Sequence, residues 1–317
     1  MAHSLPYLDA ACVHQALDFP RLIARLRCAF LSGVTAPVRH VHALSDDQPA
    51  NRLLLMPAWQ AQQSLGVKIV TVFPRNPSRG AATVGACYVL LDPHTGHPLA
   101  VLDGEALTLR RTGAVSALAT QALARQEARV LTLIGTGQLA PYMAMAHCAV
   151  RPIEQIYVWG RNLQRAEALV RQLQRAGFNA QVESQLTQAI TRADIISCAT
   201  TSDTPLVHAR DVRPGTHIDL VGGFTPTMRE ADDALMSTAS VFVDTYAGTL
   251  KEAGDLVQPI ARGTMTRNDL RAELVELLRG DHAGRQAANE ITLFKSVGTA
   301  LVDLAAAQWV YDQQRGA

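Results

Sequence analysis

The sequence predicts an α/β fold in which a Rossmann-type domain, built on a parallel sheet, is joined to a smaller α+β domain. Three observations indicate this arrangement. A glycine-rich loop lies between an apolar strand and a helix, strand and helix patterns alternate over residues 114–290, and short β-branched segments fill the first third of the chain. The 317 residues suffice for about two domains with a substantial core.

The first third of the chain predicts a mixed or antiparallel sheet. Residues 7–33 carry helical spacing, with Leu22 and Leu26 on the apolar side and Gly33 at the end. Short, β-branched strand candidates follow, separated by turns rich in Pro, Gly, Asn and Asp: residues 37–44, 52–59, 65–74, 82–91 and 98–103. These features together indicate a sheet domain.

The middle of the chain predicts a parallel sheet with helices on both faces. A helix is expected from Gly104 through Leu118. Strand candidates then alternate with helical patterns, at residues 130–134, 155–159, 180–183, 195–199, 217–222 and 241–243. Residues 291–298 and the helix up to Tyr311 do not extend this alternation, and we expect them to return to the first domain. The predicted domains are residues 1–113 with 291–317, and residues 114–290.

The segment VLTLIGTGQLA, from Val130 to Ala140, has the G-x-G-x-x-A pattern of a dinucleotide-binding turn. Gly135 permits a tight turn after the strand, Gly137 lets the backbone approach a pyrophosphate, and the small Ala140 allows close helix packing. The following helix carries Pro141 in its first turn and offers its N-terminal N–H groups to phosphate. An ordinary glycine-rich turn is the alternative, but the flanking strand and helix favour dinucleotide binding.

The end of the next strand, around Trp159, favours NADPH over NADH. NAD-preferring sites usually place Asp or Glu about twenty residues past the glycine loop, and this sequence has no acidic residue there. Gly160 leaves room, and Arg161 supplies a fixed cation that suits a 2′-phosphate. The alternative is that Arg161 is a solvated residue at a helix start. We therefore expect NADP as the cofactor, with NAD as the second choice.

The composition excludes several classes of partner. The formal net charge of +1 gives no field for binding nucleic acid, and no apolar run approaches the roughly 18 residues that span a bilayer. The start of the chain lacks a signal-peptide pattern. The five cysteines are scattered without C-x-x-C spacing, which is typical of reduced thiols rather than of disulfides or a zinc site. We expect a cytoplasmic protein with no metal ion.

Three cations interrupt otherwise apolar or small-residue stretches of the predicted sheet domain. They are Arg39, Lys68 in GVKIVTVFP, and Arg111 in LRRTGAVSA. A buried cation needs an anionic partner. The carboxylate of a substrate and a core Asp or Glu of the protein itself fit this requirement equally well.

Seven blocks of the sequence resemble, in order, the ornithine cyclodeaminase/mu-crystallin family over nearly the whole chain. These blocks are MPAW, GVKIVTVFP, RRTGAVSA, IGTGQLA, DLVGGFTPTMREADD, TLKEAGDL and ITLFKSVGTALVDLAAA. The resemblance implies a Rossmann domain inserted into a substrate-binding and dimerisation domain, a homodimer, and chemistry on a cyclic imine or an α-amino acid. It implies that Lys68, Arg111 and Arg39 bind the substrate carboxylate. The positions implied to contact the cofactor are Thr83, Arg111, Gly135, Thr136, Gly137, Gln138, Leu139, Arg161, Asn162, Thr200, Val221 and Ser296.

One departure from the cyclodeaminase pattern indicates the branch. The cyclodeaminases carry a catalytic Asp after the paired glycines, whereas here Gly222 and Gly223 are followed by Phe224. A phenyl ring can neither accept nor donate the proton that amine attack and ammonia loss require. The block GGFTPTMREADD resembles the Δ1-pyrroline-2-carboxylate reductases.

That branch implies NAD(P)H-dependent reduction of Δ1-pyrroline-2-carboxylate to L-proline, in hydroxyproline and imino-acid catabolism. Reduction of the six-membered Δ1-piperideine-2-carboxylate to L-pipecolate belongs to the same expectation. Lys68 or water could supply the proton. The alternatives are an ornithine cyclodeaminase, an alanine-type dehydrogenase and a non-catalytic mu-crystallin-like ligand-binding protein.

Overall fold

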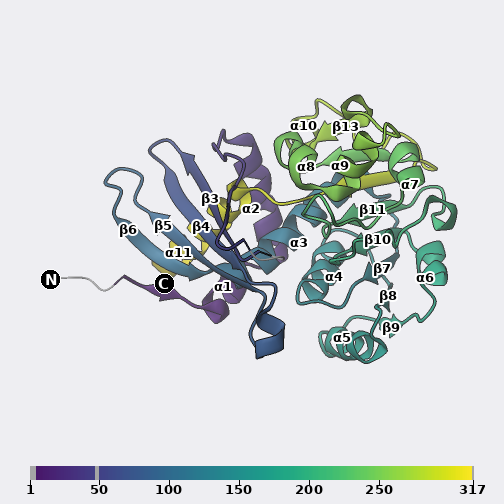
Figure 1. Ribbon diagram of the computed structural model, residues 1–317, viewed down its shortest axis with the longest axis horizontal. Coiled ribbons are helices and arrows are strands. Elements are labelled where there is room, and N and C mark those ends of the chain that lie inside the picture. The colour runs from purple at the N-terminus through teal and green to yellow at the C-terminus, as the bar shows by residue number, and fades with distance from the viewer. Residues whose placement is uncertain (1–4, 47–49, 316–317) are drawn as a thin grey trace. The chain divides into compact units, whose positions relative to one another are not determined.

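The structure, a computed structural model, describes residues 5–46 and 50–315, which form two compact units (Figure 1). The mixed-sheet unit contains the chain up to Arg111 and again from Thr299 onward. The parallel-sheet unit contains Thr112–Gly298. Each unit has its own sheet.

The mixed-sheet unit is built on six strands. In spatial order they are β1 (Tyr7–Leu8), β6 (Pro98–Asp103), β5 (Val84–Leu91), β4 (Ser64–Val72), β3 (Arg52–Gln60) and β2 (His40–Ala43). Neighbours are antiparallel except for β1, which pairs with β6 in parallel. The mixed or antiparallel sheet predicted from the sequence is confirmed.

The helical spacing of residues 7–33 corresponds to two helices rather than one. They are α1 (Ala10–Ala16) and α2 (Phe19–Leu31). The break between them is set by Asp18, whose side chain accepts a hydrogen bond from the backbone N–H of Arg21 and so caps α2. The unit also contains α11 (Ala300–Arg315), the short helix η1 (Asn76–Arg79) and the start of α3 (Gly104–Leu123).

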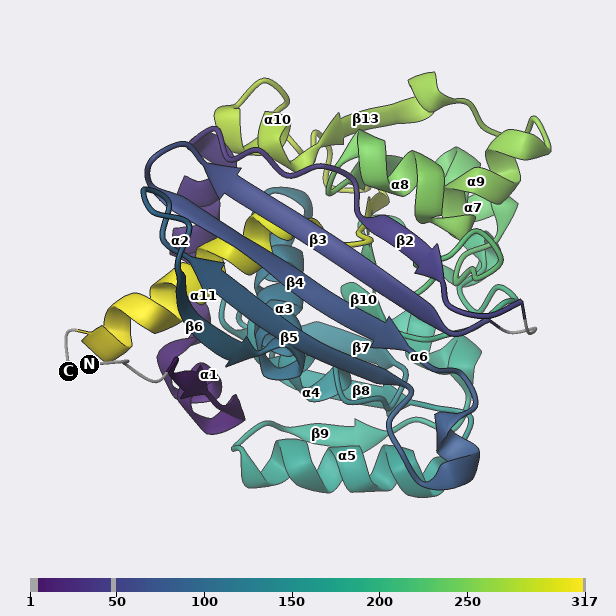
Figure 2. The same cartoon turned by 60° about the vertical axis from the view of Figure 1, so that its left-hand side comes forward.

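The two faces of this sheet differ. The helices α2 and α11 lie behind it in Figure 2, and α11 packs on β3, β4 and β5. Met56, Lys68 and Tyr88 are opposite one another on neighbouring strands and are buried on the helix side. The opposite face, which we call the outer face, carries Leu55, Val67, Ile69 and Val89, each half-buried.

The parallel-sheet unit is built on eight strands that are all parallel. In spatial order they are β13 (Leu270–Glu273), β12 (Ser240–Val243), β14 (Thr292–Lys295), β11 (His217–Leu220), β10 (Ile195–Cys198), β7 (Val130–Ile134), β8 (Gln155–Trp159) and β9 (Ala180–Val182). The helices of this unit are the rest of α3, α4 (Ala140–Cys148), α5 (Leu163–Arg175), α6 (Leu186–Arg192), α7 (Asp233–Thr238), α8 (Tyr246–Glu252), α9 (Gly254–Ala261) and α10 (Leu274–Arg279). The Rossmann-type sheet predicted from the sequence is confirmed. Among the described residues, no helix is long and apolar enough to span a membrane.

The predicted place of residues 291–298 was wrong. They do not return to the first domain, because β14 pairs in parallel with both β11 and β12 inside the eight-stranded sheet. All four residues of β14 are buried, as expected for a strand with neighbours on both sides. The chain therefore leaves the parallel-sheet unit after Gly298, and only α11 returns to the mixed-sheet unit. The edge strand β13, with the sequence LRAE, was not predicted.

Candidate functional site

The glycine-rich loop after β7 has the geometry of an anion-binding turn. Gly135 has a φ of +114°, and a Cβ there would lie 2.7 Å from the carbonyl oxygen of Ala199, so the turn requires glycine. A Cβ at Gly137 would meet nothing within 4 Å. The helix α4 follows with no side-chain cap on its first turn and with Pro141 near its start.

The backbone of this loop offers a set of donors. Among the residues that the structure describes, no hydrogen bond engages the N–H groups of Thr136, Gly137, Gln138 and Leu139. Consecutive uncommitted N–H groups at a helix N-terminus bind phosphate oxygens. The loop therefore fits the pyrophosphate of a dinucleotide.

The end of β8 lies beside this loop. The backbone N–H of Gly135 donates to the carbonyl oxygen of Trp159 at 3.0 Å, and a Cβ at Gly160 would lie 2.6 Å from the Cγ2 atom of Thr136. Arg161 is exposed. Asn162 has a structural task, because its side chain accepts a hydrogen bond from the backbone N–H of Arg165 at 3.0 Å and caps α5.

The other expected cofactor positions of this unit follow the ends of neighbouring strands. Thr200 comes after β10, Val221 after β11 and Ser296 after β14. Val221 donates its backbone N–H to the carbonyl oxygen of Cys198 at 2.9 Å. The hydroxyl of Ser296 donates to the Oδ2 atom of Asp244 at 2.9 Å. All three positions belong to the carboxyl edge of the parallel sheet, where open α/β folds bind their ligands.

A buried cluster of charged groups, which the sequence analysis missed, lies beneath this edge. The Nζ atom of Lys295 is 2.9 Å from the Oδ2 atom of Asp255 and donates to the carbonyl oxygen of Gly222. The Oδ1 atom of Asp255 accepts the N–H groups of Glu230 and Ala231 at 2.7 and 3.0 Å. Burial lowers the pKa of Lys295, but the carboxylates of Asp255 and Glu230 outweigh it, so that pKa is raised.

Phe224 lies on the loop after β11, directly after Gly222 and Gly223. Gly223 has a φ of +55°, and a Cβ there would lie 2.7 Å from the Oδ2 atom of Asp255. The loop therefore packs closely against Asp255 at Gly223. The side chain of Phe224, the next residue, is 41% exposed.

The mixed-sheet unit contains a second cluster, formed by Lys68, Arg111 and Asp303. The Nζ atom of Lys68 is 2.8 Å from each carboxylate oxygen of Asp303. The Nε atom of Arg111 donates to the Oδ1 atom of Asp303 at 2.9 Å, and Lys68 also donates to the hydroxyl of Thr108 at 3.3 Å. All three charged residues are buried. Of the two partners that the sequence left open, the structure contains the core carboxylate.

The charges of this cluster do not balance. Burial and the charge of Arg111 lower the pKa of Lys68 to about 7, against the opposing effect of Asp303. Burial raises the pKa of Asp303, but Arg111, Lys68 and the nearby Arg39 outweigh it, so that pKa is lowered. Two buried cations, Lys68 and Arg111, thus share one buried carboxylate. The excess of positive charge is what an anionic ligand would neutralise.

Two further positions belong to the mixed-sheet unit. Thr83 precedes β5, and its carbonyl oxygen accepts the N–H of Phe73 at 2.7 Å. Tyr88, opposite Lys68 on β5, is fully buried, and its hydroxyl has no hydrogen-bond partner among the described residues. Burial and the charge of Asp303 raise the pKa of Tyr88 well above its ordinary value.

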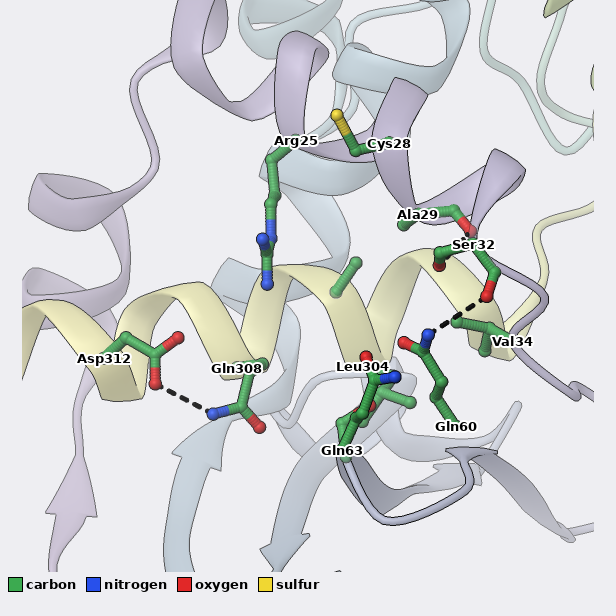
Figure 3. A pocket seen from close by; sticks show the side chains of 12 residues that line it. Arg25, Cys28, Ala29, Ser32, Val34, Gln60, Gln63, Leu304, Gln308 and Asp312 are labelled. Carbon is green, nitrogen blue, oxygen red and sulfur yellow. Dashed lines mark hydrogen bonds between the residues drawn. The ribbon is translucent and has the colours of Figure 1, made fainter. Parts of the chain in front are cut away.

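A cavity of about 290 Å³ in the mixed-sheet unit is separate from these residues. It lies between α2, the turn after β3 and α11 (Figure 3). Two of its polar side chains form hydrogen bonds within the protein: Gln60 donates to the carbonyl oxygen of Ser32 at 3.0 Å, and Gln308 donates to the Oδ1 atom of Asp312 at 2.8 Å. Lys68 and Arg111 are not among its lining residues.

Comparisons with known proteins agree with this geometry. The model of the ornithine cyclodeaminase/mu-crystallin family matches residues 18–317. The Δ1-pyrroline-2-carboxylate reductase of Colwellia psychrerythraea is 37% identical, over 96% of this chain and 98% of its own.

Two solved structures are similar over the whole chain. The Thermococcus litoralis Δ1-pyrroline-2-carboxylate reductase, in complex with NADH and L-proline, has a TM-score of 0.94 at 31% identity and covers 99% of both chains. An archaeal alanine dehydrogenase dimer with bound NAD has a TM-score of 0.91 at 28% identity, covering 99% of this chain and 97% of its own. The chain therefore belongs to the ornithine cyclodeaminase/mu-crystallin family.

Proposed function

We propose that this protein is an NAD(P)H-dependent reductase of cyclic imino acids, which converts Δ1-pyrroline-2-carboxylate to L-proline. The same site would convert Δ1-piperideine-2-carboxylate to L-pipecolate. The observation that carries the proposal is the buried, positively charged cluster of Lys68, Arg111 and Asp303. It supports the binding of a small carboxylate, in a chain that is 37% identical to a reductase of this substrate.

The cofactor would be held by the loop after β7. The uncommitted N–H groups of residues 136–139 would bind its pyrophosphate, and Gly137 leaves space for the close approach. Arg161 would bind a 2′-phosphate, which favours NADPH over NADH. When bound, the nicotinamide supplies the hydride that reduces the carbon of the C=N bond.

The cation cluster would orient the substrate. Arg111 uses its Nε atom for Asp303, and within the described part of the chain no hydrogen bond engages its two terminal amino groups. Those groups can hold a carboxylate through two parallel hydrogen bonds. Lys68 and Arg39 would add charge, and Asp303 would keep the two buried cations in place. A fixed carboxylate presents one face of the imine ring for reduction.

Lys68 is also the proton donor that we propose, where the sequence left Lys68 and water open. Its pKa of about 7 lets it hold and release a proton near neutral pH. The imine nitrogen gains this proton as the neighbouring carbon gains the hydride. We assign the proton to Lys68 because it is the titratable donor of the cluster.

We also propose that the protein is a homodimer, formed through the outer face of the six-stranded sheet. The similar alanine dehydrogenase is a dimer. Leu55, Val67, Ile69 and Val89 give this face an apolar surface. The outer face is turned away from α2 and α11 (Figure 2).

A substrate panel tests the proposed function against its alternatives. The purified protein is given NADPH with Δ1-pyrroline-2-carboxylate, Δ1-piperideine-2-carboxylate, or pyruvate with ammonia, and cofactor oxidation is followed by absorbance. We expect rapid oxidation with the cyclic imines. Faster oxidation with pyruvate and ammonia would identify an alanine-type dehydrogenase. Cofactor binding without turnover of any substrate would identify a ligand-binding protein.

A further inference from the structure

The position of Thr200 connects the buried cluster of the parallel-sheet unit to the cofactor loop. Thr200 follows β10, and β10 lies next to β7, which ends at Gly135. The chain continues from β7 to β8 on one side and from β10 to β11 on the other, so the gap between β7 and β10 is the switch point of the sheet. A Cβ at Gly135 would lie 3.2 Å from the Cγ2 atom of Thr200. Thr200 therefore borders the loop directly.

The hydroxyl of Thr200 has its proton committed. The Oε1 atom of Glu230 accepts both the backbone N–H of Thr200, at 2.7 Å, and its hydroxyl, at 2.9 Å. A threonine hydroxyl has one proton and two lone pairs. The N–H of Ser202 uses one lone pair, at 3.3 Å. One lone pair is left, and the hydroxyl can serve a ligand only as an acceptor.

Glu230 is itself held rigidly. It is fully buried, and its backbone N–H donates to Asp255, which is paired with Lys295. A Cβ at Gly222 would lie 2.4 Å from the Oε1 atom of Glu230 and 2.0 Å from the carbonyl oxygen of Thr200, so this packing requires glycine.

The hydrogen bonds and ion pairs within the protein do not fully compensate the buried carboxyl group of Glu230. Its Oε2 atom is buried and has no nitrogen or oxygen donor among the described residues, and the carboxyl interacts with the weak thiol donor of Cys198. Burial and the charge of Asp255 raise the pKa of Glu230, against the effect of Lys295. A buried carboxyl with one oxygen that lacks a strong donor lowers the stability of the fold. In return, its other oxygen holds the Thr200 hydroxyl in one fixed orientation.

We infer that Glu230 is a positioning residue for the cofactor: it fixes the Thr200 hydroxyl as an acceptor for a hydroxyl or amide N–H group of the nicotinamide half. This inference rests on the nicotinamide cofactor of the proposed function. It assigns Glu230 no contact with the substrate. Its effect is on cofactor affinity and passes through Thr200.

A double-mutant cycle on cofactor binding tests this inference. The affinity for NADPH is measured by fluorescence titration of the protein without an imine substrate. Thr200→Val removes the acceptor and should weaken binding about five-fold, the equivalent of one hydrogen bond. Glu230→Met removes the group that orients the hydroxyl and should weaken binding similarly. Because both act on one hydrogen bond, the double variant should bind no more weakly than either single variant.

Two conservative variants separate positioning from general stability. Thr200→Ser keeps the hydroxyl and Glu230→Gln keeps an acceptor oxygen, so both should bind NADPH within about two-fold of the unchanged protein. Thr132→Val serves as a control, because Thr132 lies on β7 of the same sheet and its buried hydroxyl donates to the carbonyl oxygen of Ala189 in α6. It should lower the melting temperature and leave NADPH affinity unchanged.

Several results would overturn the inference. They are normal NADPH affinity in Thr200→Val, additive losses in the double variant, and a Glu230→Met protein that is less stable but binds NADPH normally. If Glu230→Met does not fold, Glu230→Ala takes its place in the cycle, and normal NADPH affinity in Glu230→Ala would overturn the inference. A protein that binds NADPH but reduces no imine would contradict the proposed function and leave this test intact.

Discussion

At the scale of single residues, the protein contains buried clusters of charged groups whose members are far apart in the sequence. Lys68 and Asp303 are separated by 235 positions, and Arg111 and Asp303 by 192. The sequence could single out Lys68 and Arg111, because each cation interrupts an apolar or small-residue stretch. It could not identify Asp303, because a lone Asp in an alanine-rich helix reads as a solvated residue until the fold places it against both cations.

The depressed pKa of Lys68 predicts that carboxylate binding weakens as the pH rises. Lys68 is charged below its pKa of about 7 and neutral above it, so the attraction for an anion is present at lower pH and is lost as the pH rises through 7. Cyclopentanecarboxylate keeps a constant charge over this range. Its affinity for the protein should therefore fall by up to about ten-fold for each pH unit above 7. Isothermal titration calorimetry measures it. Lys68→Arg should remove the pH dependence, and an unchanged slope in that variant would exclude Lys68 as its origin.

Asp303→Asn should destabilise the protein strongly. It leaves two buried cations without their carboxylate, which costs about 3–5 kcal/mol of unfolding free energy. An added imino-acid carboxylate should then raise the melting temperature more in the variant than in the unchanged protein, because it replaces the missing anion. Asp312→Asn, on the exposed side of the same helix, is the matched control and should change little. Equal ligand-induced shifts in all three proteins would argue against an anion site at this cluster.

Arg161→Ala should change the choice of cofactor. Loss of a charge-assisted contact to the 2′-phosphate should raise KM for NADPH about ten-fold and leave KM for NADH nearly constant. Arg165→Ala, on an exposed position of α5, is the control for a general loss of charge. The measurement is steady-state kinetics with both cofactors. A similar rise for NADH would mean that Arg161 does not bind the phosphate.

At the scale of secondary-structure elements, the sequence predicted best where a local pattern decides the structure. The strands β7 and β8 have the predicted bounds, because each is a short β-branched run followed by a turn signal. The strand β14 was assigned to the wrong domain. Its position between β11 and β12 is set by pairing with strands more than forty residues earlier in the chain. In addition, its last residue is the charged Lys295, so the segment lacks the continuous apolar run of a buried strand. Long-range pairing of this kind leaves no mark in a local window.

The outer face of the mixed sheet should be required for dimer formation. Ile69→Glu places a charge among Leu55, Val67 and the neighbouring strand without touching the helix side of the sheet. The variant should be a folded monomer by light scattering and circular dichroism, because a buried unpaired charge costs several kcal/mol at an interface. Leu163→Glu, an exposed position on α5, should leave the oligomeric state unchanged. A dimeric Ile69→Glu protein would exclude this face as the interface.

At the scale of the whole molecule, the two units hold different parts of the proposed chemistry. The parallel-sheet unit carries the loop that fits a dinucleotide, and the mixed-sheet unit carries the cation cluster that fits a carboxylate. The sequence singled out the glycine loop, which is a local motif, and the family resemblance singled out Lys68 and Arg111, but neither singled out Asp303. The sequence did not predict the buried cluster of Glu230, Asp255 and Lys295, since those residues come together only at the end of the folded sheet.

The central claim is that this chain reduces a cyclic imine and does not deaminate ornithine, and one paired measurement tests it most directly. The same preparation is given NADPH with Δ1-pyrroline-2-carboxylate, and separately NAD with L-ornithine, while L-proline and ammonia are quantified. Phe224 offers no titratable group where the cyclodeaminases carry their catalytic Asp. We predict L-proline in an amount equal to the NADPH oxidised in the first reaction, and no ammonia in the second. Ornithine-dependent ammonia and proline at a rate comparable to imine reduction would contradict the claim.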